Sequence, residues 1–342
     1  MSLVVVDADV LGRRRTGDET YVRNLLRTLP EPAAEAGLDV AAVTRHPELV
    51  PDGVLPVLLP ARSQELRMAW TLPRTLRRLG AALVHTQYAL PLRSPCPAVV
   101  TIHDLSFEHG LMSRRDRLVF ERVVPRAARG AERILTVSER TKHDLVAQYA
   151  VPPERIVVAP NGVDPAFGPS PENSSNSLLR APYALSVGAI QERKNQLAAL
   201  AAAREAGLPL VVVGPVKDER VAVELRAGGA RLEGYVTTER LAELYRGAAC
   251  LVQSSRYEGF GLPVVEAMAS GTPVVIVSDP ALVEVAGEAA VVVPESELAA
   301  GIRRAVEERE TLAAAGLERA LVFTWEAAAR ATVAAYVEAL GR

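Results

Sequence analysis

The chain has 342 residues, of which 49% are hydrophobic and 23% charged, the proportions of an ordinary soluble protein rather than a disordered one. One hydrophobic core rarely serves a chain of this length, so two domains are expected. The formal net charge of −2 disfavours a nucleic-acid-binding protein, and no apolar stretch reaches the roughly 18 residues that cross a bilayer.

Short β-branched runs alternate with amphipathic stretches along the chain, a pattern typical of βαβ units around parallel sheets. A first series of strands is expected at 3–7, 39–44, 83–86, 98–102, 133–137 and 155–159. A second series is expected at 183–187, 210–213, 230–233, 250–253, 273–277 and 290–293. The predicted fold class is α/β, with two doubly wound, Rossmann-like domains that face a cleft lined by the strand ends.

The two series are separated by a tract dense in Pro, Asn, Gly and Ser, which is typical of a linker. We therefore expect an N-terminal domain at 1–165 and a C-terminal domain at 166–324. The last segment has a helical apolar period, and the helix at 325–342 is predicted to pack back on the first domain. The N-terminus lacks a basic flank followed by a cleavable apolar run, so the expected location is cytoplasmic.

Two common nucleotide-binding loops are absent from the sequence. No G-x-G-x-x-G follows the first strand, and G-x-x-x-x-G-K-[ST] occurs nowhere. Asp7-Ala8-Asp9 spells D-x-D, which either holds a divalent cation on a nucleotide phosphate or simply ends the first strand. Cys96 and Cys250 lack metal-ligand spacing and are expected to be buried thiols.

The most informative stretch runs from Glu258 to Glu266 and reads EGFGLPVVE. Its two glycines allow a close approach of the backbone to a ligand, and Pro263 suits the first turn of a helix. A helix start attracts anions, while the flanking carboxylates favour the hydroxyl groups of a sugar or ribose. The alternative is an ordinary helix start with two solvated glutamates.

This string resembles the E-x7-E region of the retaining family-4 glycosyltransferases of GT-B fold, and the likeness covers nearly the whole chain. The segment 188–195 resembles the family's phosphate-binding segment, and 161–164 resembles its linker. Further likeness lies at the first-domain strand ends 101–104 and 137–139, and at the terminal helix 323–326.

The resemblance implies how the nucleotide sugar is held. It assigns Glu266 to the ribose hydroxyls and Glu258 to the donor sugar, and places the nucleobase near Tyr235 and Val236. Backbone N–H groups are assigned to sugar or phosphate at Gly259, Phe260, Gly261 and Leu262.

Arg193 and Lys194 would stabilise the departing diphosphate, because cations aimed at developing negative charge lower the barrier. Lysine is rare in this chain, since 36 of its 39 basic residues are arginine, so the compact ammonium is expected to matter here. The alternative is two surface charges that open a helix.

His103 is expected to contact the donor sugar or to share developing positive charge through its backbone carbonyl; a purely structural hydrogen bond is the alternative. Retention implies that the acceptor hydroxyl attacks the face that the diphosphate leaves, and that a leaving-group oxygen takes the proton. Neither a metal nor another cofactor is then required.

The chain departs from the family pattern in the first-domain loop. Relatives often read Thr-Gly-Ile-Gly-Arg-Tyr, whereas this chain reads TGDETY over 16–21. Only Gly17 remains to approach the diphosphate. Asp18 and Glu19, with Asp104, are expected on the acceptor side, although the two loop acids could instead keep the loop off the phosphates. Ala189 stands where many relatives have another phosphate-binding arginine.

Two stretches of the first domain, 68–79 and 112–129, are basic and amphipathic. They indicate either peripheral contact with an anionic membrane, at its inner face, or ordinary solvated helix faces. The triple arginine at 13–15 is a candidate contact for an anionic acceptor.

The sequence thus predicts a hexosyltransferase that moves a hexose from a nucleoside-diphosphate sugar, GDP-mannose or similar, to a hydroxyl acceptor. The acceptor would be a glycan, a lipid-linked saccharide or a small metabolite. A sugar-nucleotide epimerase or phosphorylase on the same scaffold is the alternative, and a bilobal binding protein is a third hypothesis.

Overall fold

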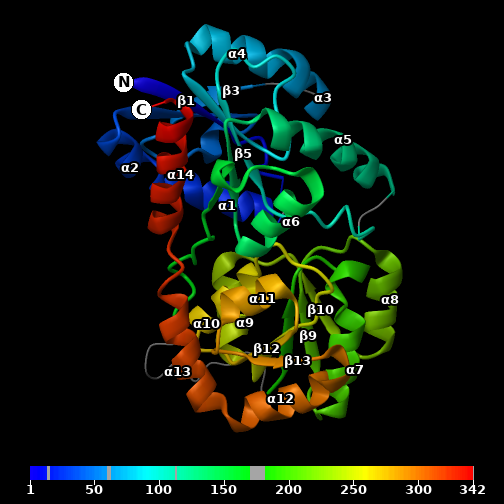
Figure 1. The fold of residues 1–342 in the computed structure, drawn as a ribbon. Helices are drawn as coiled ribbons and strands as arrows, with labels where there is room; N and C mark the ends of the chain where they lie inside the picture. The colour runs from blue at the N-terminus through cyan, green and yellow to red at the C-terminus, as the bar shows by residue number, and fades with distance from the viewer. Residues whose placement is uncertain (14–15, 60–62, 112–113, 170–181, 342) are drawn as a thin grey trace. The chain divides into compact units, whose positions relative to one another are not determined.

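The computed structural model describes residues 1–13, 16–59, 63–111, 114–169 and 182–341. The chain divides into two compact units (Figure 1). Unit 1 comprises Met1–Gly162 and Trp325–Arg342, and unit 2 comprises Val163–Thr324. The first crossing between the units thus lies three residues before the boundary expected at 165/166.

The sheet of unit 1 has seven parallel strands in the order β3-β2-β1-β4-β5-β6-β7. The strands are β1 (Ser2–Asp7), β2 (Leu38–Thr44), β3 (Leu55–Leu58), β4 (Leu83–Gln87), β5 (Ala98–Ile102), β6 (Arg133–Thr136) and β7 (Ile156–Val158). The order reverses between β1 and β4. The carboxyl ends of these two strands therefore form the switch point at which doubly wound sheets bind ligands.

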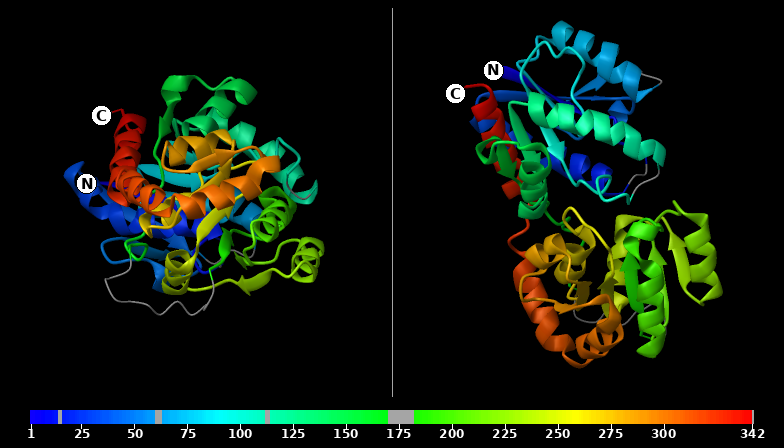
Figure 2. Two further views of the ribbon diagram at one scale, coloured as in Figure 1. Left: turned by 90° about the horizontal axis from the view of Figure 1, so that it is seen from below. Right: turned by 45° about the vertical axis from the view of Figure 1, so that its right-hand side comes forward.

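Helices cover both faces of this sheet (Figures 1 and 2). Side chains alternate along β1: Val4 and Val6 pack in a cluster with α1, α2 and α14, while Val5 packs on the other face with α4. The helices are α1 (Thr16–Thr28), α2 (Pro30–Glu35), α3 (Gln64–Leu66), a π-helical turn (Arg67–Thr71), α4 (Leu72–Leu79), α5 (Arg114–Gly130), α6 (Glu139–Tyr149) and α14 (Trp325–Ala339), with 3₁₀ turns at Pro47–Leu49 and Pro153–Arg155.

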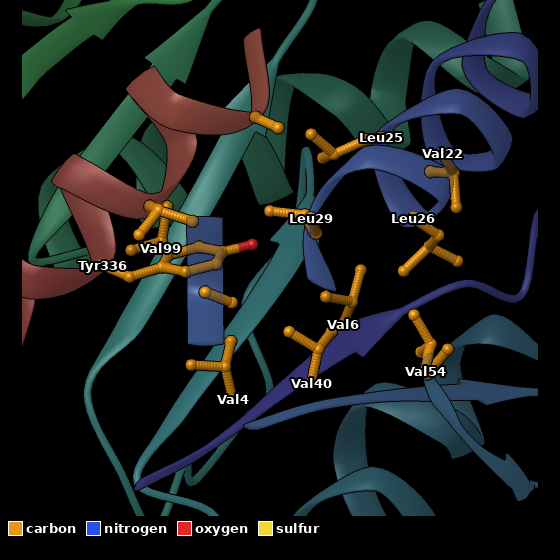
Figure 3. Close-up of a cluster of buried hydrophobic side chains, with 14 of the residues drawn as sticks. Val4, Val6, Val22, Leu25, Leu26, Leu29, Val40, Val54, Val99 and Tyr336 are labelled. Atoms are coloured by element: carbon orange, nitrogen blue, oxygen red, sulfur yellow. The ribbon is translucent and has the colours of Figure 1, made fainter. Parts of the chain in front are cut away.

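The C-terminal helix α14 belongs to the core of unit 1. Figure 3 shows Tyr336 in one cluster with Leu25 of α1, Leu29 between α1 and α2, and Val4 of β1. The Tyr336 hydroxyl lies 2.6 Å from Nδ1 of His85. The other ring nitrogen of His85, Nε2, lies 2.7 Å from the hydroxyl oxygen of Thr101. Burial lowers the pKa of His85 to about 3, so the ring is neutral and serves this internal network.

Strand β3 was not predicted from the sequence. It contains Pro56, which cannot donate a ladder hydrogen bond, and it pairs with β2 alone, at the edge where proline is tolerated. Leu55 and Leu58 are exposed, so the run has no apolar face that would mark it as a strand. All the strands that were predicted from the sequence are present in the two units, and none of their ends is shifted by more than one residue.

Unit 2 is built around a second parallel sheet, of six strands in the order β10-β9-β8-β11-β12-β13. They are β8 (Ala184–Val187), β9 (Leu210–Val213), β10 (Arg231–Gly234), β11 (Cys250–Gln253), β12 (Val274–Val277) and β13 (Val291–Val293). Here the order reverses between β8 and β11. Both units are thus doubly wound and Rossmann-like, which confirms the predicted α/β class with two such domains.

The helices of unit 2 alternate with its strands. They are α7 (Gln196–Glu205), α8 (Glu219–Ala227), α9 (Thr238–Gly247), α10 (Leu262–Ala269), α11 (Pro280–Ala286), α12 (Leu298–Glu307) and α13 (Arg309–Ala320), with 3₁₀ turns at Glu192–Lys194 and Glu295–Glu297. Cys250 is buried as predicted, whereas Cys96 of unit 1 is only half-buried. Within the parts of the chain that the structure describes, no helix combines the length and apolarity needed to span a bilayer.

Candidate active site

Two loops meet at the switch point of unit 2, because β8 and β11 are neighbours in the sheet. The loop after β8 carries Arg193 and Lys194, here called the cation pair, and the loop after β11 carries Glu258. Hydrogen bonds join the two loops: the Ser254 hydroxyl donates to the carbonyls of Lys194 (3.2 Å) and Asn195 (2.8 Å). The Arg256 N–H also donates to the Arg193 carbonyl (3.0 Å). The cation pair is therefore fixed relative to the loop of Glu258.

Two glycines make room for this arrangement. A Cβ on Gly214, after β9, would lie 2.1 Å from the carbonyl oxygen of Gly188, which no side chain tolerates. A Cβ on Gly188 would press on Cε of Lys194 at 3.2 Å, and both glycines have φ near +145°. Glycine at these positions lets the lysine lie across the end of β8.

The carboxylate of Glu258 is bonded to the cation pair. Its Oε1 lies 2.5 Å from Nζ of Lys194 and accepts a 2.7 Å hydrogen bond from Gln253, while Oε2 lies 3.3 Å from Nη1 of Arg193. Burial would raise the pKa of Glu258, but the charges of Lys194 and Arg193 outweigh that effect and lower it to about 2. Glu258 is therefore ionised at neutral pH.

Asp279 holds the other side of the Glu258 loop. Its Oδ1 accepts the N–H groups of Ala281 and Leu282 at the start of α11, and its Oδ2 accepts the Glu258 N–H at 3.4 Å. The sequence analysis missed this residue, although aspartate directly before Pro280 is a recognisable helix start.

Glu266 lies on α10, one helix turn beyond the glycine loop. The helix begins after Gly261, whose φ is +108° and whose added Cβ would lie 2.8 Å from Leu282, so glycine is required there. Tyr245 donates a 2.8 Å hydrogen bond to Oε2 of Glu266. Burial raises the pKa of Glu266 to about 7, and the carboxylate of Asp164 adds to that effect. Tyr245 and Asp164 were not singled out from the sequence.

The other residues predicted to bind the donor differ from one another in how far they are buried. The Phe260 ring is buried against Phe323, with centroids 5.7 Å apart, so only its backbone is available to a ligand. Gly259 is buried and Leu262 half-buried. Tyr235 follows β10, two strands away from β8, and is 55% exposed; the adjacent Val236 is half-buried. Contacts thus join the cation pair to Glu258, whereas Tyr235 follows a strand at the far edge of the sheet.

In unit 1, His103 directly follows β5 and packs against two aromatic rings. Its ring centroid lies 4.6 Å from that of Tyr21, edge-on, and 5.5 Å from that of Tyr88. Nε2 lies 3.4 Å from the amide oxygen of Gln87, and the Thr141 hydroxyl donates to the His103 carbonyl at 3.2 Å. Burial lowers the pKa of His103, against the opposing effect of nearby carboxylates, so the imidazole is neutral at pH 7.

The carboxylates near His103 belong to Asp18 and Asp104, two of the predicted acceptor-side residues. Asp104 also accepts the Ser106 N–H at 2.9 Å and so shapes its own loop.

The predicted loop residues Gly17, Asp18 and Glu19 lie in the first turn of α1. An added Cβ on Gly17 would meet no described atom within 4 Å, so unit 1 itself does not demand a glycine there. Glu19 is buried, and its Oε1 accepts the Gly12 N–H at 3.1 Å and a 2.6 Å bond from Arg23. These bonds give Glu19 a role in holding the loop after β1.

The D-x-D sequence after β1 is paired with arginines. Nη1 of Arg67 lies 2.5 Å from Asp7 and 3.2 Å from Asp9, Nε of Arg45 lies 2.8 Å from Asp9, and Arg13 pairs with Asp9 as well. Over the described ranges, no three His, Cys, Asp or Glu side chains gather as metal ligands would. Of the triple arginine, residues 14–15 lie outside the described residues.

Comparison with known proteins agrees with this architecture. Residues 15–167 match the family model described as Glycosyltransferase Family 4, and residues 171–318 match that of Glycosyl transferases group 1. O-antigen chain mannosyltransferase B of Escherichia coli is 32% identical over 265 residues, which cover 70% of this chain and 70% of the relative. The chain belongs to glycosyltransferase family 4, with the GT-B fold, and is a hexosyltransferase.

Solved structures share the fold. Sucrose-phosphate synthase from Thermosynechococcus elongatus superposes with a TM-score of 0.77 at 23% identity, covering 99% of both chains. Anabaena HepE in complex with UDP and glucose gives a TM-score of 0.74 at 16% identity, also covering 99% of both chains. The epimerase or phosphorylase alternative is not favoured by any of these likenesses.

Proposed function

We propose that this glycosyltransferase moves a hexose from a nucleoside-diphosphate sugar, GDP-mannose or similar, to a hydroxyl acceptor, with retention at the anomeric carbon. The observation that carries the proposal is the cation pair beside Glu258 at the switch point of unit 2. The mannosyltransferase relative supports a hexose donor of this kind, and the UDP complex of HepE supports a nucleoside diphosphate.

The cation pair stabilises the leaving group. As the bond between the sugar and the diphosphate breaks, negative charge grows on the phosphate oxygens. The cation pair stands directly before α7, a helix whose N-terminus adds a partial positive charge. A charge-neutralising site of this composition needs no divalent metal.

The two glutamates bind the neutral parts of the donor. Glu258 accepts hydrogen bonds from the hexose hydroxyls, and Glu266, oriented by the Tyr245 hydroxyl, binds the ribose hydroxyls. The backbone of Gly259, Phe260, Gly261 and Leu262 contacts sugar or phosphate. The nucleobase lies by the exposed Tyr235 and the adjacent Val236.

The proton of the acceptor goes to the leaving group. In a retaining reaction the acceptor hydroxyl attacks the face that the diphosphate leaves, and a phosphate oxygen on that face accepts its proton. No dedicated base is required. We therefore assign His103, which is neutral at pH 7, to a hydrogen bond with a donor hydroxyl rather than to proton transfer. Asp18 remains a candidate for the acceptor hydroxyls, and Gly17 a point of close approach.

Helices α4 and α5 supply the proposed contact with an anionic membrane. Trp70, just before α4, is 57% exposed under the guanidinium of Arg74, and Leu118 and Val119 of α5 are 47% and 46% exposed. Apolar side chains among arginines suit a charged bilayer surface, where lipid-linked acceptors reside.

A transfer assay tests the proposal. The purified protein is incubated with GDP- and UDP-hexoses, each with and without a mixture of glycan and lipid-linked acceptors, and the anomeric configuration of the product is read by NMR. We expect donor consumption that depends on the acceptor and a retained anomer. Donor turnover without any acceptor, or an inverted product, would contradict the proposal.

A further inference from the structure

The carboxylate of Glu258 is bonded to the two cations that the proposed function assigns to the diphosphate. Lys194 and Arg193 reach Glu258 at 2.5 and 3.3 Å, distances at which an ammonium or guanidinium would also hold a phosphate oxygen. All three side chains are largely buried, with side-chain exposures of 12%, 14% and 7% for the lysine, arginine and glutamate. In such surroundings charge interactions are screened little by solvent.

The three side chains together carry a charge of +1, because Glu258 remains ionised at neutral pH. A diphosphate near the cation pair therefore meets a carboxylate of its own sign. That repulsion grows with the charge of the ligand. A nucleoside diphosphate released by the reaction has a free terminal phosphate and bears one more negative charge than the nucleotide sugar.

We propose that Glu258 competes intramolecularly with the diphosphate for the cation pair and thereby selects the nucleotide sugar over the free nucleoside diphosphate. This inference rests on the proposed function and deepens it. When the donor binds, the carboxylate turns from the cation pair to the hexose hydroxyls, and the phosphates take its place on Lys194 and Arg193. Once the hexose has left, Glu258 returns to the cations and weakens the hold on the product.

The surroundings of Glu258 suit this exchange. The Gln253 amide donates to Oε1 of Glu258 at 2.7 Å and also to the Ser255 hydroxyl at 3.1 Å, so it keeps a partner when the carboxylate turns away. The backbone is held separately, because Asp279 accepts the Glu258 N–H while it anchors the start of α11. The side chain can therefore change partners while its loop stays fixed.

The test compares dissociation constants measured by titration calorimetry. The probes are GDP and UDP, each beside its hexose conjugate, with wild type, Glu258→Gln and Glu258→Asp. We expect Glu258→Gln to bind the free nucleoside diphosphate about tenfold more tightly than wild type, as coupling energies of close charge pairs allow. The hexose conjugate should gain nothing, because the glutamine variant also loses contacts to the sugar.

Glu205→Gln is the matched control. Glu205, the last residue of α7 in the same unit, has a side chain that is 69% exposed and lies 3.5 Å from Arg303, so its replacement should leave both dissociation constants unchanged. Glu258→Asp keeps the negative charge that the buried cations need for folding. Its side chain is one methylene shorter, so the carboxylate lies farther from Lys194 and Arg193. It should bind the free diphosphate roughly threefold more tightly, and it decides the matter if the glutamine variant does not fold.

The outcomes separate two failures. If wild type binds the conjugates but neither Glu258 variant binds the free diphosphate more tightly than wild type, the competition is disproved and the proposed function stands. If wild type binds none of the four probes, the proposed function falls and this inference falls with it.

Discussion

Tyr245 of α9 donates a 2.8 Å hydrogen bond to Glu266 of α10, and neither side chain has appreciable contact with solvent. The phenol fixes one carboxyl oxygen, while burial and the charge of Asp164 raise the pKa of Glu266 to about 7. A carboxylate with this pKa is only partly ionised at neutral pH, and its charge is then sensitive to what binds beside it.

Glu266→Gln should therefore stabilise the protein at high pH. The folded pKa of Glu266, about 7, lies above its usual 4.5, so ionisation costs folding free energy as pH rises from about 5 towards 8. The full cost corresponds to about 3 kcal/mol, and glutamine, which keeps an acceptor for Tyr245, removes it.

Thermal unfolding from pH 5 to 9 measures this effect. The melting temperatures of Glu266→Gln and wild type should be similar near pH 5, diverge as the pH rises towards 7, and stay apart at pH 8 to 9, with the variant higher. Glu288→Gln, at an exposed position of the same unit, serves as the control and should follow wild type. Parallel curves for wild type and Glu266→Gln at all pH values would disprove the raised pKa.

Tyr245→Phe should raise the KM for the donor with little change in kcat. The variant loses the hydrogen bond that orients Glu266 while the aromatic ring continues to fill the core. A lost bond of this type weakens donor binding by about five- to tenfold. Steady-state kinetics with the donor varied at saturating acceptor checks this, and a fall confined to kcat would contradict the assignment of Glu266 to binding.

Lys194→Ala should reduce kcat/KM by about 100-fold or more, because it removes a cation aimed at the leaving group. Lys217→Ala is the matched control: this lysine is exposed in the same unit and should leave the rate unchanged. Circular dichroism must show both variants folded, since Glu258 loses its 2.5 Å partner when Lys194 is removed. Equal transfer rates in the two variants would refute the role of the cation pair.

Removal of divalent ions should leave the transfer rate unchanged. Asp7 and Asp9, the one sequence motif that suggested a cation, are paired with Arg67, Arg45 and Arg13. Initial rates measured after dialysis against EDTA, and again after addition of Mg²⁺ or Mn²⁺, provide the check. A rate lost with EDTA and restored by either ion would show that the reaction uses a metal.

Periodicity in the sequence was sufficient to predict the two sheets, because buried parallel strands are continuous β-branched runs such as LVVV at 210–213. Periodicity did not predict the elements that lack such a run. The edge strand β3 has exposed leucines and a proline, so it lacks a local apolar signal. The amphipathic stretch at 68–79 stood out in the sequence, but nothing in it indicated the π-helical turn at 67–71, in which Arg67 pairs with the buried Asp7.

The candidate site was predictable as far as the chain itself brings residues together. The string from Glu258 to Glu266 is contiguous, and its glycines and proline indicate a loop before a helix. Tyr245 and Asp279 contribute through contacts made across separate elements, which no spacing in the sequence records. Conversely, Glu19 looked available to a ligand in the sequence, whereas the fold buries it against the loop after β1.

The position of the diphosphate is the most direct test of the account. A crystal structure of the protein with a GDP- or UDP-hexose should place a phosphate oxygen within about 3 Å of the Lys194 ammonium, with the Glu258 carboxylate turned to the sugar. A diphosphate bound elsewhere, with Lys194 and Glu258 still joined at 2.5 Å, would contradict it.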